Sequence, residues 1–334
     1  MENKKYYLSK AKRIFNEVKK DVIGKDEEIC KVMMAVLAKG NILIDDIPGV
    51  GKTTMTLSFA KAMDLKCNRV QFTPDVMPSD ILGFNMFNKA TNQFEFKEGA
   101  ANCNILLADE INRTSPKTQS ALLQVMEENA ITVEGKIVKL PDPFIVMATQ
   151  NPLGSIGTQK LPESQLDRFM IKISMGYPSF EDEVLILKNN GFSKERIKAE
   201  KAVGIDELLS LIEYVNDIYV DDSIYEYIAR IAEKTRKSEY IIHGISPRGG
   251  IAVLAMAKSF AFLRGHDYVL PSDVVSVLAD TVCHRLVLNR DFGQTKNKAK
   301  DILDSVVKEV EAPKLNTKEN DAAIIWWGNR DVDA

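Results

Sequence analysis

The stretch Asn41-Ile42-Leu43-Ile44-Asp45-Asp46-Ile47-Pro48-Gly49-Val50-Gly51-Lys52-Thr53-Thr54 decides the fold. Its apolar start, residues 41–44, predicts a buried strand, and residues 55–63 predict a helix. A strand, a glycine-containing loop, Lys-Thr and a helix in this order are typical of a phosphate-binding P-loop. The N–H groups of the loop and of the helix start would face a polyphosphate, which Gly49 and Gly51 let the backbone approach closely.

Each position of this loop has an expected partner in Mg·ATP. Lys52 would reach the β- and γ-phosphates, and the Thr53 hydroxyl would bind Mg²⁺. The candidate nucleotide-binding residues of the loop are Pro48, Gly49, Val50, Gly51, Lys52, Thr53 and Thr54.

One residue of the loop departs from the usual pattern, which begins with glycine where this chain has Asp46. An acidic side chain near phosphates could weaken nucleotide binding by repulsion. It could also point away, because the first position of the loop is farthest from the phosphates. The sequence leaves both readings open, beside the plainer one that residues 48–51 form an ordinary turn.

Composition describes a soluble globular protein. The chain has 334 residues, 45% of them hydrophobic and 27% charged, and a net charge of -3. This length fits about two domains, and the acidic balance implies no general affinity for nucleic acid or anionic membranes. The N-terminus leads into no apolar signal stretch, and no apolar run approaches the ~20 residues of a membrane span. Four scattered cysteines and three scattered histidines predict reduced thiols in a cytoplasmic protein, without a metal-ligand cluster.

A second apolar run carries two acids at its end. Residues 104–108 read Asn-Ile-Leu-Leu-Ala and are followed by Asp109 and Glu110. Continuous apolar runs are typical of parallel strands covered on both faces, and ligands of such sheets bind at the carboxyl ends of the strands. We predict that Asp109 organises Mg²⁺ as a Walker B acid and that Glu110 polarises the attacking water. The alternative is a solvated strand end.

A third apolar run, residues 144–148, ends in Thr149-Gln150-Asn151. A polar side chain at this edge can contact the γ-phosphate or position the attacking water. Asn151 is the first candidate for this role and Thr149 the second.

The order of elements predicts the fold class. Strands that alternate with helices up to residue 176 predict an α/β fold, an αβα sandwich around a parallel sheet. Residues 84–96 and 131–140 predict two inserted β-hairpins, the first of which would be decoration or, in a ring, an element facing the pore. After residue 176 we predict helices alone, over residues 181–189, 205–218, 223–237, 247–263 and 271–288. The expected divisions are therefore residues 1–176, an all-helical domain 177–310 and a polar tail 311–334.

Three further features have two readings each. Val22 and Ile23 would pack on an adenine ring or in the core. Arg248 lies in the first turn of a predicted helix, where a cation opposes the helix dipole, so it would bind an anion or be an ordinary surface residue. In the tail, the apolar residues 324–327 include Trp326 and Trp327, the two tryptophans of the chain, and would dock to a partner or cover a groove on the same protein or its neighbour.

Together the motifs resemble those of the MoxR family of AAA+ ATPases over about residues 5–310. The segments that carry the resemblance are Gln71-Phe72-Thr73-Pro74-Asp75, Ala108-Asp109-Glu110-Ile111-Asn112-Arg113, Lys117-Thr118-Gln119-Ser120-Ala121-Leu122-Leu123, Ala148-Thr149-Gln150-Asn151-Pro152 and Leu161-Pro162-Glu163-Ser164-Gln165-Leu166-Asp167-Arg168-Phe169. Asp46 departs from the glycine of the family.

The resemblance assigns roles to residues of this chain. Lys52 and Thr53 match Walker A, Asp109 and Glu110 match Walker B, and Asn151 matches sensor 1. Arg248 matches sensor 2, which senses the γ-phosphate, and Arg168 matches the arginine finger, which reaches the nucleotide of the next subunit. The expected catalytic residues are thus Lys52, Glu110, Asn151 and Arg168, and the expected metal ligands are Thr53 and Asp109.

The resemblance also implies an assembly and a class of work. Such ATPases form rings, usually hexamers, and remodel proteins in a chaperone-like manner, often with a partner that carries a von Willebrand factor A domain. A competing hypothesis is a nucleotide-gated scaffold that assembles and docks a partner with little turnover, and Asp46 and the tail favour it. A third, an AAA+ protein acting on nucleic acid, is disfavoured by the acidic balance.

Overall fold

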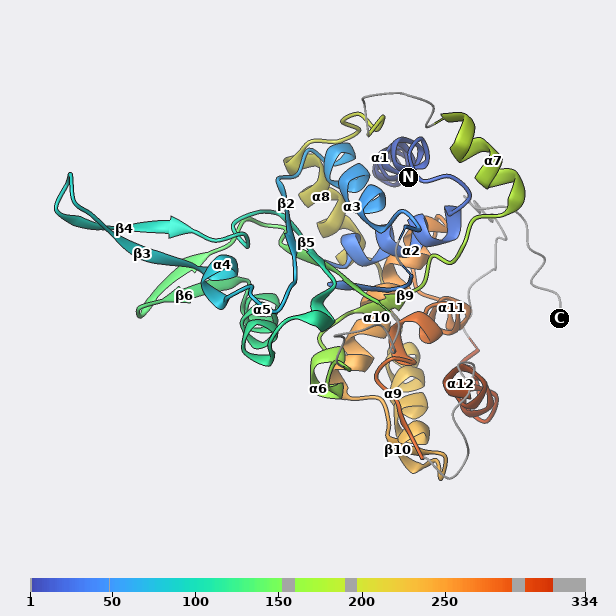
Figure 1. Ribbon diagram of the computed structural model, residues 1–334. Coiled ribbons are helices and arrows are strands. Elements are labelled where there is room, and N and C mark those ends of the chain that lie inside the picture. Colours follow the sequence, from blue (N-terminus) through green and yellow to red (C-terminus); the bar gives the residue numbers. More distant parts are fainter. Residues whose placement is uncertain (1, 48, 152–159, 190–196, 290–297, 315–334) are drawn as a thin grey trace.

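The computed structural model describes residues 2–47, 49–151, 160–189, 197–289 and 298–314. A five-stranded parallel sheet, ordered β2-β5-β8-β1-β9, forms the centre of its N-terminal part (Figure 1). Its strands are β1 (Ile42–Asp45), β2 (Cys67–Gln71), β5 (Ile105–Asp109), β8 (Ile145–Gln150) and β9 (Ile171–Ile173). The predicted parallel sheet is confirmed, and the carboxyl ends of its strands meet at one edge.

The strands β1, β5 and β8 bury alternate side chains on opposite faces, as the pleat requires. One face packs against α1 (Glu2–Lys19), α2 (Asp26–Leu37) and α3 (Lys52–Ala62), and its buried strand residues include Ile42, Ile44, Ile105, Ile145 and Met147. The other packs against α4 (Pro78–Leu82) and α5 (Pro116–Glu128), and its buried strand residues include Leu43, Leu106, Ala108, Val146 and Ala148. Coverage on both faces explains why these strands read as continuous apolar runs.

Two hairpins lie outside the sheet. One consists of β3 (Gly83–Asn88) and β4 (Gln93–Glu98), and the other of β6 (Ala130–Val133) and β7 (Lys136–Lys139). The β3–β4 hairpin reaches away from the body of the molecule (Figure 1). It carries exposed large apolar side chains: Phe84, Met86, Phe87, Phe94 and Phe96.

The C-terminal part is built mainly from helices. They are α7 (Phe180–Asn189), α8 (Ile205–Asn216), α9 (Asp222–Lys237), α10 (Pro247–Leu263), α11 (Pro271–Val282) and α12 (Lys298–Lys308), preceded by the short α6 (Glu163–Leu166). None of the helices in the described ranges is both long and apolar enough to cross a membrane.

The expectation of helices alone after residue 176 is wrong in detail. The strands β10 (Ile241–His243) and β11 (Val287–Leu288) pair antiparallel, so the helix expected over 271–288 ends at Val282. Strands of three and two residues are too short to show a period in the sequence, and their pairing joins segments distant in the chain. The helix α12 was also not predicted.

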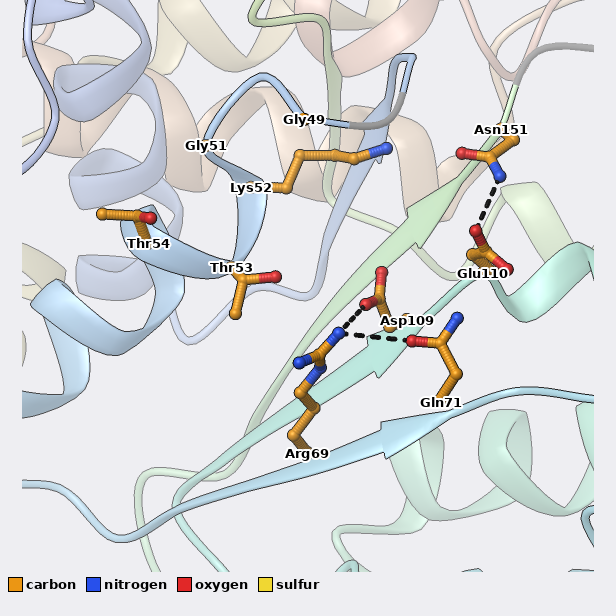
Figure 2. A pocket seen from close by; sticks show the side chains of 10 residues that line it. All are labelled: Gly49, Gly51, Lys52, Thr53, Thr54, Arg69, Gln71, Asp109, Glu110 and Asn151. Atoms are coloured by element: carbon orange, nitrogen blue, oxygen red, sulfur yellow. Dashed lines mark hydrogen bonds and ion pairs between the residues drawn. The ribbon is translucent and has the colours of Figure 1, made fainter. Parts of the chain in front are cut away.

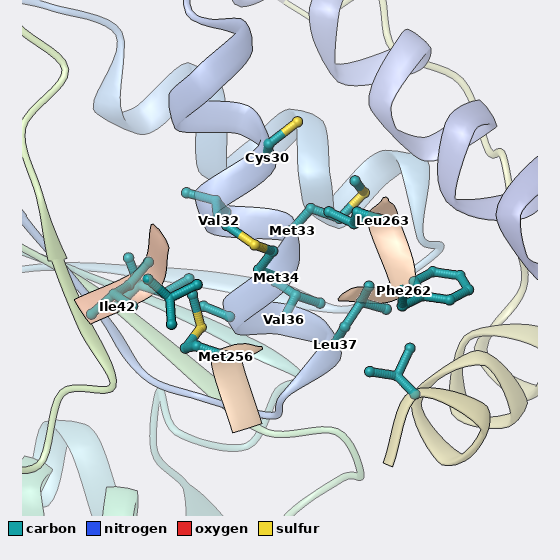
Figure 3. Packing of buried hydrophobic residues seen from close by; sticks show 14 of the residues in the cluster. Cys30, Val32, Met33, Met34, Val36, Leu37, Ile42, Met256, Phe262 and Leu263 are labelled. Carbon is teal, nitrogen blue, oxygen red and sulfur yellow. The ribbon is translucent and has the colours of Figure 1, made fainter. Parts of the chain in front are cut away.

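One apolar core joins the sheet and the C-terminal helices. Met33 and Leu37 of α2 belong to the same buried cluster as Met256, Phe262 and Leu263 of α10 (Figure 3). Each of these five side chains is at most 1% exposed. The helical part is therefore held against the part that contains the sheet by packing, and not by the connecting chain alone.

Candidate functional site

The P-loop lines an open cavity of about 400 Å³ at the carboxyl edge of the sheet (Figure 2). Gly49 and Gly51 have φ values of 89° and 95°, which favour glycine, and Gly51 directly precedes α3. The first amides of α3 therefore have no partner within the helix and are available to an anion. The residues around the cavity are Gly49, Gly51, Lys52, Thr53, Thr54, Arg69, Gln71, Asp109, Glu110 and Asn151.

Lys52 is only 7% exposed, and its Nζ donates a hydrogen bond of 2.6 Å to the carbonyl oxygen of Asp46. Burial lowers the pKa of Lys52, although Asp109 and other nearby carboxylates oppose this shift. Among the described contacts, the ammonium forms no ion pair with a carboxylate, and the phosphates of a nucleotide would give it an anionic partner. Thr53 lies on the Asp109 side of the loop in Figure 2.

The side chain of Asp46 faces away from the cavity. Its Oδ2 accepts hydrogen bonds from the Ser174 hydroxyl (2.9 Å) and the Gly176 amide (2.6 Å), and its Oδ1 accepts one from the Ile47 amide (2.8 Å). Burial by itself would raise the pKa of Asp46, but these donors outweigh burial and leave it lowered. Of the two readings of the sequence, the geometry favours the second: the carboxylate ties the P-loop to the segment after β9.

The acid at the end of β5 is held from two sides. Asp109 is 9% exposed; its Oδ1 accepts from the Thr149 hydroxyl at 2.6 Å, and its Oδ2 pairs with Arg69 at 2.7 Å. The same Thr149 hydroxyl accepts from the Glu110 amide at 2.9 Å. Thr149 is fully buried, so it fixes the two acids instead of meeting a ligand.

Glu110 and Asn151, from neighbouring strand ends, touch each other. The Asn151 Nδ2 donates to Glu110 Oε1 at 2.8 Å, and Arg113 pairs with Glu110 Oε2 at 2.7 Å. Burial would raise the pKa of Glu110, but the hydrogen bonds from Arg113 and Asn151 outweigh it, so the pKa is lowered. The carboxylate is thus ionised at neutral pH, as a group that accepts a proton from water must be.

Arg168 and Arg248 lie outside this cavity, side by side on another surface. Arg168 pairs with Glu127 Oε2 at 3.2 Å, and Arg248 pairs with Glu127 Oε1. The carboxylate that Arg248 meets at the start of α10 is therefore Glu127 of α5, and not an anion in the cavity of its own chain.

Sequence reasoning missed the residues that position Arg168. Arg285, 7% exposed, donates to the Asp167 carboxylate at 2.7 Å and to the Phe169 carbonyl oxygen at 2.6 Å. The Ser246 hydroxyl, at the start of α10, donates to the same carboxylate at 3.1 Å. Arg285 had no signal in the sequence, because one arginine after a helix is unremarkable.

Two cavity residues that the sequence analysis also missed, Arg69 and Gln71, did have a signal, since they share a face of a strand that ends at the phosphate edge.

Val22, Ile23 and Val50 do not line the cavity. Val22 is 4% exposed and belongs to the apolar core, so packing is its observed role; Ile23 is partly exposed and Val50 packs partly buried against that core. Pro48 and the Trp326-Trp327 segment lie outside the described residues.

A phosphate-binding loop, a strand-end acid pair and a parallel sheet with this strand order define a P-loop ATPase of the AAA+ class. Residues 41–171 match the family described as "ATPase family associated with various cellular activities (AAA)", and residues 233–306 match the AAA lid domain.

Comparison with individual proteins narrows the class. The chain is 43% identical to YeaC of Bacillus subtilis over 92% of its own length and 95% of that protein. It is 37% identical to Chaperone MoxR1 of Mycobacterium tuberculosis, over 91% and 82% of the two chains. A crystal structure of a Cytophaga hutchinsonii protein superposes with a TM-score of 0.86 at 34% identity and covers 94% of this chain and 98% of that one. The chain belongs to the MoxR family of AAA+ ATPases, and ATP hydrolysis is its activity.

Proposed function

We propose that this ATPase works as a Mg²⁺-dependent ring of identical subunits that remodels a partner protein. The observation that carries the proposal is the hydrogen bond of 2.8 Å between Glu110 and Asn151, in one cavity with Lys52 and Asp109. A nucleotide-gated scaffold needs only the P-loop to bind its nucleotide, whereas a positioned and ionised glutamate at the phosphate edge is useful for ATP turnover.

The residues at the strand edge fit Mg²⁺. The Thr53 hydroxyl and the Asp109 carboxylate face the same cavity, and both offer the oxygen atoms that this ion prefers. These two side chains would hold the ion, which supplies positive charge to the phosphates when it is bound. One carboxylate, one hydroxyl and the substrate phosphates are a typical donor set for Mg²⁺.

The chain's own groups then divide the work of hydrolysis. The loop amides and the start of α3 bind the phosphates, and Lys52 exchanges the Asp46 carbonyl for a phosphate oxygen. Glu110 orients the attacking water and accepts its proton, and Asn151 holds Glu110 in place. Thr149 keeps Asp109 and the Glu110 backbone at a fixed separation.

We assign Arg168 and Arg248 to the nucleotide of the adjoining subunit. Both pair with Glu127 away from the cavity of their own chain, so the face that presents one presents the other. Head-to-tail contact closes a ring in which every site receives these cations, and a hexamer is the size implied by the resemblance. An arginine supplied in trans can raise turnover by ~10³-fold or more.

A protein is the proposed client. MoxR1 is named a chaperone, and the β3–β4 hairpin offers five exposed apolar side chains to a polypeptide. A partner with a von Willebrand factor A domain rests on the family resemblance alone. The net charge of -3 disfavours nucleic acid. All four cysteines are free, which agrees with the cytoplasm as the proposed compartment.

The Glu110→Gln variant tests this function against the scaffold alternative. We expect turnover to fall by about 10²-fold or more, because the proton acceptor is lost, while nucleotide binding and ATP-dependent assembly persist. Steady-state ATPase assays and mass measurement with and without Mg·ATP report the two properties, with the exposed Glu213→Gln as a matched control. If Glu110→Gln turns over like the wild type, Glu110 is not the base; if it supports function in cells, the scaffold is the better account.

A further inference from the structure

Arg69 is a cation in the cavity to which the sequence assigned no role. It lies on β2, next to β5, and its guanidinium meets Asp109 Oδ2 at 2.7 Å and Gln71 Oε1 at 3.3 Å (Figure 2). Asp109 is the carboxylate proposed to hold Mg²⁺. The pair therefore sits where metal and nucleotide would meet.

The two partners of Asp109 differ in their freedom to leave. Thr149 is fully buried and also holds the Glu110 amide, so it has no room to move. The Arg69 side chain is 51% exposed, whereas that of Asp109 is 13% exposed. A nearly buried carboxylate without a cation is costly, and Arg69 removes this cost as long as no metal is bound.

The other charges around the cavity have their own partners. Lys52 donates to the Asp46 carbonyl oxygen, and Glu110 pairs with Arg113. Among the described residues that line the cavity, Lys52 and Arg69 are the cations, and Arg69 alone has an ion pair with Asp109. Lys52 is near enough to feel the charge of Asp109, but the direct ion pair of this carboxylate is made by one exposed side chain, that of Arg69.

We infer that Arg69 is the resident cation of Asp109, which it neutralises in the metal-free protein and yields to Mg²⁺ when Mg·nucleotide binds. This inference rests on the proposed function, because it assumes Asp109 as a metal ligand. Arg69 is a positioning residue that sets how strongly nucleotide binding depends on the metal. While Arg69 is paired with Asp109, the carboxylate repels the phosphates less, so the affinity for nucleotide without Mg²⁺ is higher than it would be without this pair.

Arg69 and the metal compete for one carboxylate oxygen, and two cations close together repel each other. Without metal, removal of Arg69 leaves the Asp109 carboxylate without a direct cation partner, which weakens nucleotide binding. With metal, the same removal takes away the side chain that competes with Mg²⁺ for this carboxylate. The coupling between metal and nucleotide should therefore rise, and this coupling is the same whichever ligand is varied.

The measurement is the dissociation constant of a fluorescent ADP in EDTA, divided by that in saturating Mg²⁺. For Arg69→Gln we expect this ratio to rise by roughly threefold to tenfold over the wild type, as for the loss of one half-exposed ion pair beside a divalent site. Arg69→Lys, which keeps a charge, should lie between the two. Arg230→Gln is a matched control, because it removes an exposed ion pair with Glu226 far from the cavity and should leave the ratio unchanged.

A double variant separates the inference from other roles of Arg69. In an Asp109→Asn background, Arg69→Gln should no longer change the ratio, because the two side chains act as a pair. A ratio equal to that of the wild type would overturn the inference; if both dissociation constants were then weakened by the same factor, Arg69 would bind the phosphates directly. If the wild type itself bound ADP equally with and without Mg²⁺, the proposed metal site would fail, and this inference with it.

Discussion

Replacement of Asp46 by glycine, the residue usual at this position of a P-loop, should destabilise the protein without improving nucleotide binding. The structure explains both expectations. The carboxylate accepts three hydrogen bonds, from Ser174, Gly176 and Ile47, on the side of the loop that faces away from the cavity. Its backbone carbonyl, which holds Lys52, is unchanged by the substitution.

The size of the loss follows from these contacts. A hydrogen bond to a charged group contributes about 1.5–3 kcal/mol, but ionised Asp46 also carries a desolvation cost, and the exposed Ser174 can bond to water instead. We expect a net loss of roughly 2–4 kcal/mol in the free energy of unfolding. With an unfolding entropy of about 2 cal/mol/K per residue over 334 residues, this loss lowers Tm by roughly 3–6 °C.

Thermal unfolding and titration with a fluorescent nucleotide measure the two effects. The affinity of Asp46→Gly for Mg·ADP should remain within about threefold of the wild type, because the lost charge points away from the ligand. Asp46→Asn, which keeps one oxygen acceptor, should recover part of the stability. The reasoning is refuted if Asp46→Gly binds nucleotide tenfold more tightly at an unchanged Tm, because the carboxylate would then be repelling the phosphates.

Two other predictions concern Arg168 and His284. Arg168→Ala should lower turnover by about 10³-fold, and mixing it with Lys52→Ala should restore part of the activity, because an intact Arg168 then meets an intact P-loop at shared interfaces; confirmed mixed rings without recovery would count against action in trans. Burial beside Arg285 lowers the pKa of His284 to about 3, so between about pH 6.5 and 3 the unfolded chain binds a proton that the folded chain does not, and stability falls as the pH falls. Urea unfolding should show that His284→Gln removes about 1.4 kcal/mol of the loss between pH 7.5 and 5.5, and an unchanged pH dependence would show that His284 is not buried as a neutral ring.

The sheet was predictable because its strands carry their own signal. Three strands are apolar on both faces, as is typical of a parallel sheet covered on both sides, and each ends in polar groups: Ile42–Asp45, Ile105–Asp109 and Ile145–Gln150. The loop chemistry at Lys52 followed from local order along the chain. Local patterns of this kind survive in the sequence because the residues that form them are adjacent.

The direction of side chains at the site was not predictable. Asp46 has donors 128 and 130 residues away, and Glu127 meets two arginines from other elements. Such contacts exist only after the chain has folded, and one sequence carries no pattern for them. The strands β10 and β11 were missed for the same reason. The divisions at residues 176 and 310 and the roles of the site residues stay predictions.

Arg285 connects the end of α11 to the segment that carries Arg168. It follows α11 and donates hydrogen bonds to the carbonyl oxygens of Asp167 and Phe169 and to the Asp167 carboxylate. Ser246, at the start of α10, donates to the same carboxylate. A tilt of these helices therefore cannot leave Arg168 where it was. If Arg168 serves the adjoining subunit, as proposed, a ligand that displaces α11 would change the rate of hydrolysis at a nucleotide that it does not contact.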